Sequence, residues 1–550
     1  MSLGQTRSQG SGPADVSLKS RKGDIGDGLA VIPPGEKQLD AIFSELDQSH
    51  LPGAAVGVAL GGVPFYRKGF GLANMELPVA LTPSMRMRLF SISKHFACLS
   101  YLLLCEEGRA ALDAPIGQHL PELHPVAREV TARQLMSNTS GLRDSHDIAW
   151  LFSGTDSSFS SADLLQFYCT INDANAPAGT AWIYNNGGFL LITAAVERIS
   201  GQPMEEFLRR RILEPAGMFS TQLRRTNTDF LPNSATMHMT RPGGGFERSY
   251  LGGERAGEGG IVSTVDDMLR WLAHMDAPVV GREASWTAMK TPHRLPNGTS
   301  TGYGLGLFSG NYRGVETLFH SGGGMGANAF MIKVPSVRLD VVVLVNRHDV
   351  DSSGLAYKVV DCCVRGLASP ATVAPRPVIS GVYRSRATGR VLQLFGKDCR
   401  QRAWIDNYDL ALRTSEDGGL LPAEGFEFLK QEIVPLDAEA SPRRIRFNDF
   451  GNVDVLERLP PATQPIDPAV GRYRSDETGT DAEVFASGTG PQLRSVGRFG
   501  SRTFDLSPLA DRVWHAQGRL PWMGGIVSFD DSGFRLTTAR NWALPFRRVS

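Results

Sequence analysis

Residues 88–108 read RLFSISKHFACLSYLLLCEEG, a stretch that predicts the most buried helix of the chain. Its apolar side chains run nearly all the way round between Phe96 and Leu104, which is typical of a helix at the centre of a large domain. Ser91 and Lys94 stand at the start, three residues apart, and would face the same way. The stretch therefore predicts a central helix whose first turn presents a hydroxyl and an ammonium together.

Strands are predicted at both ends of the segment that surrounds this helix. Residues 53–74 read as two strands around a Gly-Gly turn, and residues 300–346 read as an antiparallel meander containing GYGLGLF, ETLFHSGG, ANAFMIKV and LDVVVLVN. Helices are predicted between them at 188–201, 205–213 and 264–275. This order predicts an α+β domain whose sheet is assembled from the two ends of the segment.

A repeat marks the region that follows. ISGVYRSRATGRVLQL begins at Ile379 and AVGRYRSDETGTDAEV begins at Ala469, and both contain the pattern G-x-Y-R-S-x-x-T-G. Two copies at such a long period do not make a solenoid. Helical patterning is lost here and short strands dominate, so the repeat predicts two small antiparallel β-barrels of one kind.

The length of 550 residues is too great for a single hydrophobic core. The Pro/Ala-rich stretch ASPATVAPRP and the shorter QPIDP predict linkers. The expected divisions are a disordered N-terminal tail of residues 1–35, the α+β domain of residues 36–370, and two β-barrels of residues 371–463 and 464–550.

Composition excludes several classes of function. Lys+Arg and Asp+Glu both number 57, and there is no basic stripe with interleaved aromatics, so no nucleic acid partner is expected. The N-terminus lacks the apolar core of a signal peptide, and no apolar run is long enough to span a membrane. The six cysteines form no CxxC and predict no metal site; sparse cysteines in apolar runs are typical of thiols in a reducing compartment. These features predict a cytoplasmic protein.

The pair Ser91 and Lys94 suits nucleophilic catalysis. Free backbone N–H groups at the start of a helix stabilise an oxyanion formed there. A lysine in an apolar site loses hydration, which lowers its pKa and lets it act as a base. The alternative is an N-cap serine followed by a solvated lysine. Of the ten lysines, only Lys94 has a serine three residues before it, and a solvated lysine is least expected before so apolar a helix.

Two further elements carry chemical groups. Tyr184 and Asn186 form the only Y-x-N in the chain, and in an extended loop they would point to the same side. A phenol can relay a proton and an amide can hold both a carbonyl and a lysine. Taken alone, this pair reads more readily as an aromatic anchor in a glycine-rich turn.

The stretch LFHSGGGMG places His320 at the end of an apolar strand, followed by glycines that let backbone approach a ligand. Gly322 and Gly323 are therefore candidate substrate-binding residues. The N–H of Gly323 could join that of Ser91 in an oxyanion hole. The alternative is a structural or surface histidine.

Together and in this order, the three elements resemble the SxxK, YxN and K/HxG motifs of penicillin-recognising serine hydrolases, which include class C β-lactamases, DD-carboxypeptidases and related esterases. The similarity spans roughly residues 40–365 and includes LMSNTSGLRD and GGIVSTVDDMLRW. It implies a β-lactamase/transpeptidase-like fold for the α+β domain. With two barrels behind it and a chain end reading WALPFRRV, the chain is also similar to D-stereospecific aminopeptidases.

The resemblance implies a role for each motif residue. Ser91 would be the nucleophile, Lys94 its proton acceptor and donor, and Tyr184 a proton relay. Asn186 would hold the substrate and the lysine. His320 would take the place of a lysine in β-lactamases. Histidine is mostly neutral at pH 7, which weakens carboxylate recognition and argues against β-lactam hydrolysis and DD-carboxypeptidase activity. No metal or organic cofactor is needed.

One departure concerns the last barrel. In the aminopeptidases a loop of that barrel enters the cleft and an acidic residue meets the substrate ammonium. The matching stretch, residues 515–529, contains no Asp or Glu and offers Arg519 and Trp522. An arginine would repel a free amine and attract an anion. Asp505, upstream, is the alternative acid.

The sequence thus predicts a serine hydrolase that works through an acyl-enzyme on a small peptide, amide or ester. The favoured reaction is release of an N-terminal D-residue. The alternatives are an esterase or DD-peptidase of the same superfamily, and a non-catalytic binder of cell-wall peptides. The resemblance also implies a homodimer.

Overall fold

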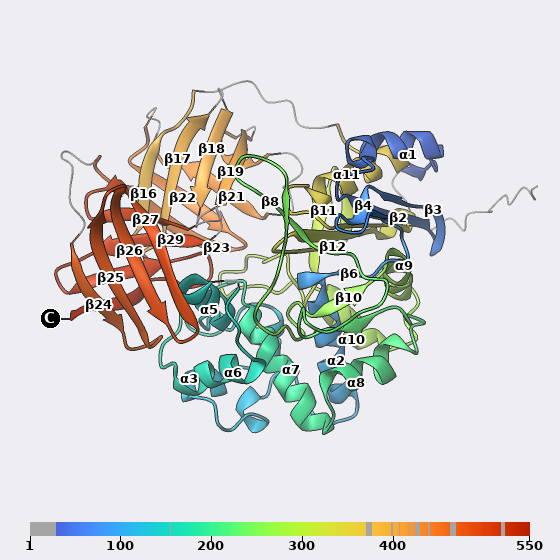
Figure 1. Ribbon diagram of the computed structural model, residues 1–550, viewed down its shortest axis with the longest axis horizontal. Helices are drawn as coiled ribbons and strands as arrows, with labels where there is room; N and C mark the ends of the chain where they lie inside the picture. Colours follow the sequence, from blue (N-terminus) through green and yellow to red (C-terminus); the bar gives the residue numbers. More distant parts are fainter. Residues whose placement is uncertain are drawn as a thin grey trace, which may run out of the picture.

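The computed structural model describes residues 29–549 apart from 155, 370–376, 398–399, 406–407, 416, 424–428, 438–440, 462–468 and 519–522. An α+β domain occupies one side of the molecule, and two β-barrels lie next to each other on the other side (Figure 1). The fold class predicted from the sequence is confirmed. Among the described residues, no helix combines the length and hydrophobicity needed to cross a membrane.

The α+β domain is built on a six-stranded antiparallel sheet in the order β11-β12-β13-β14-β2-β3. Its strands are β11 (Phe308–Tyr312), β12 (Val315–Gly324), β13 (Ala327–Val334), β14 (Leu339–Val345), β2 (Ala54–Leu60) and β3 (Val63–Phe70). The sheet is therefore assembled from both ends of the domain, as expected. Residues 302–307, predicted as a strand, are instead a loop in which Gly302 and Gly306 have φ near +70°.

Both faces of this sheet are covered. Along β14, Val341 and Val343 face a layer that contains α1 and α11, whereas Val342 and Leu344 face the larger layer around α2. The helices are α1 (Glu36–Phe43), α2 (Lys94–Glu106), α3 (Pro125–Arg128), α4 (Ala132–Met136), α5 (Ser145–Ser153), α6 (Ser161–Thr170), α7 (Asn186–Ser200), α8 (Met204–Leu208), α9 (Val265–His274), α10 (Glu283–Lys290) and α11 (Ser352–Cys363). Alternation of side chains along each strand thus gives two cores.

Helix α2 lies inside the larger layer, as its sequence predicts. Every residue from Lys94 to Leu104 is buried. The helix begins three residues later than Ser91, which belongs to the 3₁₀ turn η2 (Phe90–Ser93). Phe90 has a φ of 47°, in the left-handed region that a non-glycine residue seldom adopts. Such backbone conformations are concentrated at functional sites.

The other predicted helices are confirmed with shifted ends. The helix expected at 188–201 is α7 and begins two residues earlier, at Asn186. The one expected at 205–213 is divided into α8 and the π-helical turn η4 (Arg209–Leu213). Helix α9 has the predicted N-cap, because Thr264 Oγ1 accepts a hydrogen bond from the Asp267 N–H.

The repeat corresponds to two closed eight-stranded barrels. The first contains β16 (Gly381–Ser385), β17 (Val391–Lys397), β18 (Arg400–Ile405), β19 (Tyr408–Thr414), β20 (Leu420–Pro422), β21 (Gln431–Pro435), β22 (Arg444–Asp449) and β23 (Asn452–Arg458). The second contains β24 (Gly471–Ser475), β25 (Thr480–Ser487), β26 (Gly490–Gly497), β27 (Gly500–Ala510), β28 (Val513–Gln517), β29 (Gly524–Phe529), β30 (Gly533–Thr537) and β31 (Leu544–Val549). The repeated tyrosines, Tyr383 and Tyr473, are both buried in first strands.

The expected divisions between domains fall at 370/371 and 463/464, inside stretches outside the described residues. The same holds for residues 1–28 of the expected tail. Residues 29–35 are described, and within them β1 (Ala30–Val31) pairs with β15 (Val364–Arg365). This pairing attaches the start of the described chain to the end of the α+β domain.

Glycines let β12 lie directly on the turn that carries Ser91. A Cβ added to Gly322 would be 1.9 Å from the Leu89 carbonyl oxygen, and one added to Gly324 would be 2.2 Å from the Phe90 ring. A Cβ added to Gly323 would meet no atom within 4 Å. The strand therefore approaches η2 through Gly322 and Gly324, while the position between them is open.

We expect Gly322→Ala to lower the free energy of unfolding by about 1–3 kcal/mol, because the new methyl group would press on backbone that has to move. Gly323→Ala is the matched control on the same strand and should change it by less than about 0.5 kcal/mol. Urea denaturation of both variants, followed by circular dichroism, measures the difference. Equal midpoints for the two variants would contradict the packing described for Gly322.

Candidate active site

Lys94 connects the groups predicted to act together. Its Nζ donates hydrogen bonds to Ser91 Oγ at 3.2 Å, to Asn186 Oδ1 at 2.8 Å and to the Glu258 carbonyl oxygen at 2.8 Å. The lysine side chain is fully buried. All three ammonium hydrogens thus have acceptors, and none of these acceptors is a carboxylate.

Burial decides the protonation of this lysine. Loss of hydration lowers the pKa of Lys94 to about 7, and the negative charge of Glu258 opposes the shift without cancelling it. Near neutral pH the amine is therefore present in both protonation states. An amine that can lose its proton at this pH can take one from the Ser91 hydroxyl.

Tyr184 lies next to the same ammonium. The Lys94 Nζ is 4.8 Å from the centroid of the Tyr184 ring. Burial raises the pKa of Tyr184, and its hydrogen bond with Ser91 partly offsets the rise. The phenol is therefore protonated at neutral pH and in hydrogen-bond contact with the serine. The structure brings together Ser91, Lys94, Tyr184 and Asn186, the first two motifs predicted from the sequence.

The residue after Tyr184 fixes its backbone. Asn185 caps α7, because its Oδ1 accepts from the Gly188 N–H at 2.9 Å. Its own N–H donates to Asn138 Oδ1 at 3.0 Å, and its Nδ2 donates to the Leu142 carbonyl at 2.8 Å. The SNTSGL stretch, noted in the sequence for its resemblance, thus holds the Y-x-N loop in place.

His320 is buried against the same region as a neutral ring. Its Nδ1 is 2.6 Å from the Ser321 carbonyl oxygen, and its Nε2 is 3.2 Å from Tyr303 Oη. The carbonyl can only accept, so Nδ1 carries the proton and Nε2 accepts from the phenol. Burial lowers the pKa of His320 to about 3, with a further contribution from Lys94. Both ring nitrogens are engaged, and the role of His320 in catalysis stays a prediction.

Gly322 and Gly323 lie on β12 beside the nucleophile turn. Gly322 pairs with Ala329 and Gly323 with Asn328 across the sheet. The contact of Gly322 with Leu89 places this part of the strand two residues from Ser91 in the adjoining turn. An oxyanion hole formed by the N–H groups of Ser91 and Gly323 stays a prediction.

A buried carboxylate below the lysine was missed from the sequence. Glu258 Oε1 is 3.3 Å from His146 Nε2, and both Glu258 oxygens accept from the Ala256 N–H. Burial alone would raise the pKa of Glu258, but His146, Arg255 and the Ala256 N–H outweigh it and lower the pKa to about 2. These bonds fix the residue whose carbonyl accepts from Lys94. No local sequence motif identifies Glu258.

The second barrel reaches the site with the turn between β30 and β31. Asn541 Oδ1 accepts from the Asp144 N–H at 2.9 Å, and Asn541 Nδ2 donates to Asp147 Oδ2 at 2.8 Å. Arg540 Nη1 is 3.5 Å from Asp144 Oδ2, and its guanidinium carbon is 5.2 Å from the centroid of the Tyr184 ring. This turn, residues 538–543, was not predicted to take part.

The loop that was predicted to enter the cleft is only partly described. Arg519 and Trp522 lie outside the described residues. Asp505, the alternative acid, is exposed on β27 and accepts a hydrogen bond from Gln492 at 2.8 Å. Among the described residues the barrel contact at the site is made by the turn of residues 538–543, and the part of the predicted loop that contains Arg519 and Trp522 stays a prediction.

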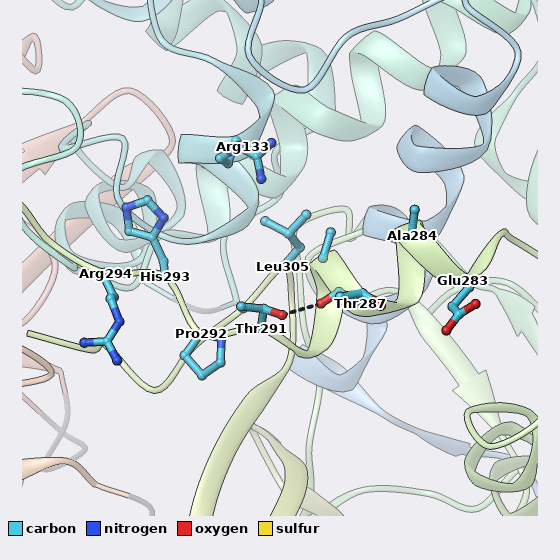
Figure 2. Close-up of a pocket in the computed structure, with 11 residues that line it drawn as sticks. Arg133, Glu283, Ala284, Thr287, Thr291, Pro292, His293, Arg294 and Leu305 are labelled. Carbon is cyan, nitrogen blue, oxygen red and sulfur yellow. Dashed lines mark hydrogen bonds between the residues drawn. The ribbon is translucent and has the colours of Figure 1, made fainter.

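Two cavities lie apart from the cluster around Lys94. One of about 670 Å³ opens beside α10 and the loop that follows it (Figure 2). Its lining includes Arg133, Glu283, His293 and Arg294, and contains none of the predicted catalytic residues. A second, of about 280 Å³, is lined mainly by residues of the first barrel. Neither cavity contains the cluster around Lys94.

Known proteins are similar to this chain over different lengths. A D-aminopeptidase from Gluconobacter oxydans (strain 621H) is 27% identical over 340 residues, which are 62% of this chain and 64%, less than two thirds, of the relative. D-aminopeptidases from Cereibacter sphaeroides (strain KD131 / KCTC 12085) and Brucella canis (strain ATCC 23365 / NCTC 10854 / RM-666) are each 26% identical. Their alignments cover 86% and 93% of this chain and 90% and 94% of the relatives. The longer alignments thus extend into the barrels.

Solved structures agree in fold. A penicillin-binding protein homologue from Pyrococcus abyssi, described as octameric, superposes with a TM-score of 0.55 at 20% identity, over 76% of this chain and 99% of the other. A D-amino acid amidase from Ochrobactrum anthropi superposes with a TM-score of 0.51 at 22% identity, over 59% of this chain and 97% of the other. The Beta-lactamase family profile matches residues 39–360, more than half of the chain. The chain therefore belongs to the Beta-lactamase family.

Proposed function

We propose that this protein is a serine hydrolase that releases N-terminal D-amino acids from peptides or amides through an acyl-enzyme. The observation that carries the proposal is the buried Lys94 amine, hydrogen-bonded to Ser91 and Asn186 beside Tyr184. The full-length similarity to proteins named D-aminopeptidase supports the substrate class. The D-amino acid amidase of the same fold supports chemistry on amides.

The proposed reaction uses these groups in two steps. Ser91 Oγ attacks the substrate carbonyl carbon while its proton passes to neutral Lys94, with Tyr184 relaying it to the leaving amine. The N–H groups of Ser91 and Gly323 would stabilise the tetrahedral oxyanion. The C–N bond breaks and the amine leaves with the proton. Water then attacks the carbonyl carbon of the ester while neutral Lys94 takes one of its protons; the bond from that carbon to Ser91 Oγ breaks, Lys94 returns the proton to Ser91 Oγ, and the acid is released.

Ser91→Ala should reduce hydrolysis of the p-nitroanilide of D-alanine by at least about a thousandfold, because the nucleophile is lost. Ser100→Ala is the matched control, since Ser100 is buried on the same helix and its hydroxyl donates to the Phe96 carbonyl in that helix. The L-alanine and N-acetyl-D-alanine p-nitroanilides should be poor substrates.

Other outcomes separate the alternatives. Ser91-dependent cleavage of a p-nitrophenyl ester, with no release from any anilide, would overturn the aminopeptidase and leave an esterase. Binding of a peptide that Ser91→Ala leaves unchanged, with no hydrolysis of any substrate, would indicate a binder.

The activity should depend on pH through Lys94. Only the neutral amine of Lys94 can accept the Ser91 proton. Because the pKa of Lys94 is lowered to about 7, half of the molecules carry a neutral Lys94 at that pH. We therefore expect kcat/KM to rise as the pH increases through about 7 and to fall tenfold per unit below it. His320→Gln is the control, since a ring with a pKa of about 3 is already neutral and should leave this limb in place.

The measurement is kcat/KM from pH 4 to 10 for three proteins: the wild type, His320→Gln and Lys94→Arg. An acid limb near pH 4, or one that disappears in His320→Gln, would show that a different group is the base.

We also propose a cytoplasmic homodimer. The five described cysteines are free thiols, which supports a reducing compartment. Light scattering after size-exclusion chromatography tests the assembly.

A further inference from the structure

Each barrel contacts the segment of residues 181–184, here called the Tyr184 segment, through the equivalent hairpin of its own. In each barrel it is the turn between the seventh and eighth strands: residues 450–451 between β22 and β23, and residues 538–543 between β30 and β31. The repeat seen in the sequence thus continues into the contacts that the two barrels make with the α+β domain.

The first barrel holds the segment by stacking. Phe450 lies on the Trp182 ring with centroids 4.1 Å apart and planes 23° from parallel. Asn452 adds two hydrogen bonds to the Trp182 backbone, accepting from its N–H at 2.8 Å and donating to its carbonyl at 2.6 Å. These contacts fix the chain two residues before Tyr184.

The second barrel holds the opposite face of the segment. Trp542 packs with Ala181 and Ile183, which alternate with Trp182 and Tyr184 along the extended chain. The turn itself is anchored by Asn541, which is fully buried, and by hydrogen bonds from Asn175 to the Arg540 carbonyl and from the Trp542 N–H to Asn175. The turn is therefore held firmly without the Arg540 side chain.

This anchoring aims the Arg540 guanidinium at the catalytic phenol. Its central carbon is 5.2 Å from the Tyr184 ring centroid, within the range of a cation–π contact. Asp144 Oδ2 lies 3.5 Å from Arg540 Nη1, and the Asp144 carboxylate also accepts hydrogen bonds from the N–H groups of His146 and Gly187. Arg540 keeps 22% of its side chain exposed, so its charge lies at the edge of the site.

We propose that Arg540 is a positioning residue for the hydrolase proposed above: the second barrel supplies it to hold the Tyr184 ring and to set the charge around the Ser91–Lys94–Tyr184 relay. The inference rests on the proposed function. It gives the barrel a direct part in the chemistry of a domain that precedes it in the chain.

The Arg540 cation adds its own effect on the pKa of Lys94 and of Tyr184 to the effects of the other charges around the relay. Besides Arg540, the titratable groups that act on Lys94 or Tyr184 are Asp144, Glu258 and Cys98, and the buried rings of His95 and His320 are themselves influenced by Lys94. Burial is the largest influence on both relay groups, and Arg540 lowers the pKa of Lys94 and of Tyr184. At Tyr184 its effect exceeds the opposing effect of Asp144. Removing the cation should therefore favour protonated Lys94.

The test compares Arg540→Gln and Arg540→Met with Arg540→Lys in the full chain. The substrate is a p-nitrophenyl ester, and the readout is kcat/KM against pH. Loss of the charge should move the acid limb to higher pH by roughly half a unit to one unit, because one unit charge acts over several ångströms of partly buried protein. Arg540→Lys should keep the limb close to its wild-type position. Arg512→Gln, which removes an exposed arginine from the same barrel, is the matched control.

The outcomes separate this inference from the proposed function. If Ser91→Ala retains activity, the proposed hydrolase is wrong. Activity can require Ser91 while Arg540→Gln and Arg540→Met both keep the acid limb of kcat/KM at its wild-type pH. In that case Arg540 is only structural, whether or not kcat/KM itself is lower, and the inference is overturned. Melting temperatures show which variants are folded, and the second neutral variant keeps the test valid if one of them is not.

Discussion

The site depends on burying an ammonium group without a carboxylate to pair with it. A charge removed from water is strongly destabilised unless it is paired or loses its proton. Lys94 meets three neutral oxygens instead, from Ser91, Asn186 and the Glu258 backbone. Each acceptor comes from a different part of the chain, so the surrounding fold has to bring η2, α7 and the Glu258 loop to one point. The apolar helix behind Lys94 keeps hydration low, which lowers the pKa of its amine so that the neutral form is available near neutral pH.

Local patterns revealed the parts of this arrangement whose causes are local. The apolar run after Lys94, the Y-x-N at Tyr184 and the repeat at Tyr383 and Tyr473 each occupy a short stretch, and each corresponds to an element of the structure. The stretch at 302–307 misled because alternating glycines and leucines resemble a strand, whereas positive φ values bend it into a loop.

The missed residues act across long distances in the chain. Glu258 is identified only by where its carbonyl lies, and Arg540 only by a turn nearly at the C-terminus that returns to the site. Neither carries a motif, because single acids and arginines are common on any surface. Barrel loops look alike in sequence, so choosing the one that enters a cleft requires the placement of the whole barrel. The two barrels have the same strand order, and equivalent turns, at Phe450 and at Arg540, both contact the Tyr184 segment.

The long return from Tyr184 to Arg540 has a consequence during synthesis. A ribosome adds about 5–20 residues per second, so the 356 residues from Asn185 to Arg540 take roughly 20–70 s to make. The turn that contains Phe450 is made before the end of that time, and the turn that contains Arg540 only at its end. The segment around Tyr184 gains its contacts with Arg540 and Trp542 only once the hairpin of β30 and β31 has been made, so the proposed catalytic groups reach their described arrangement after the second barrel has formed.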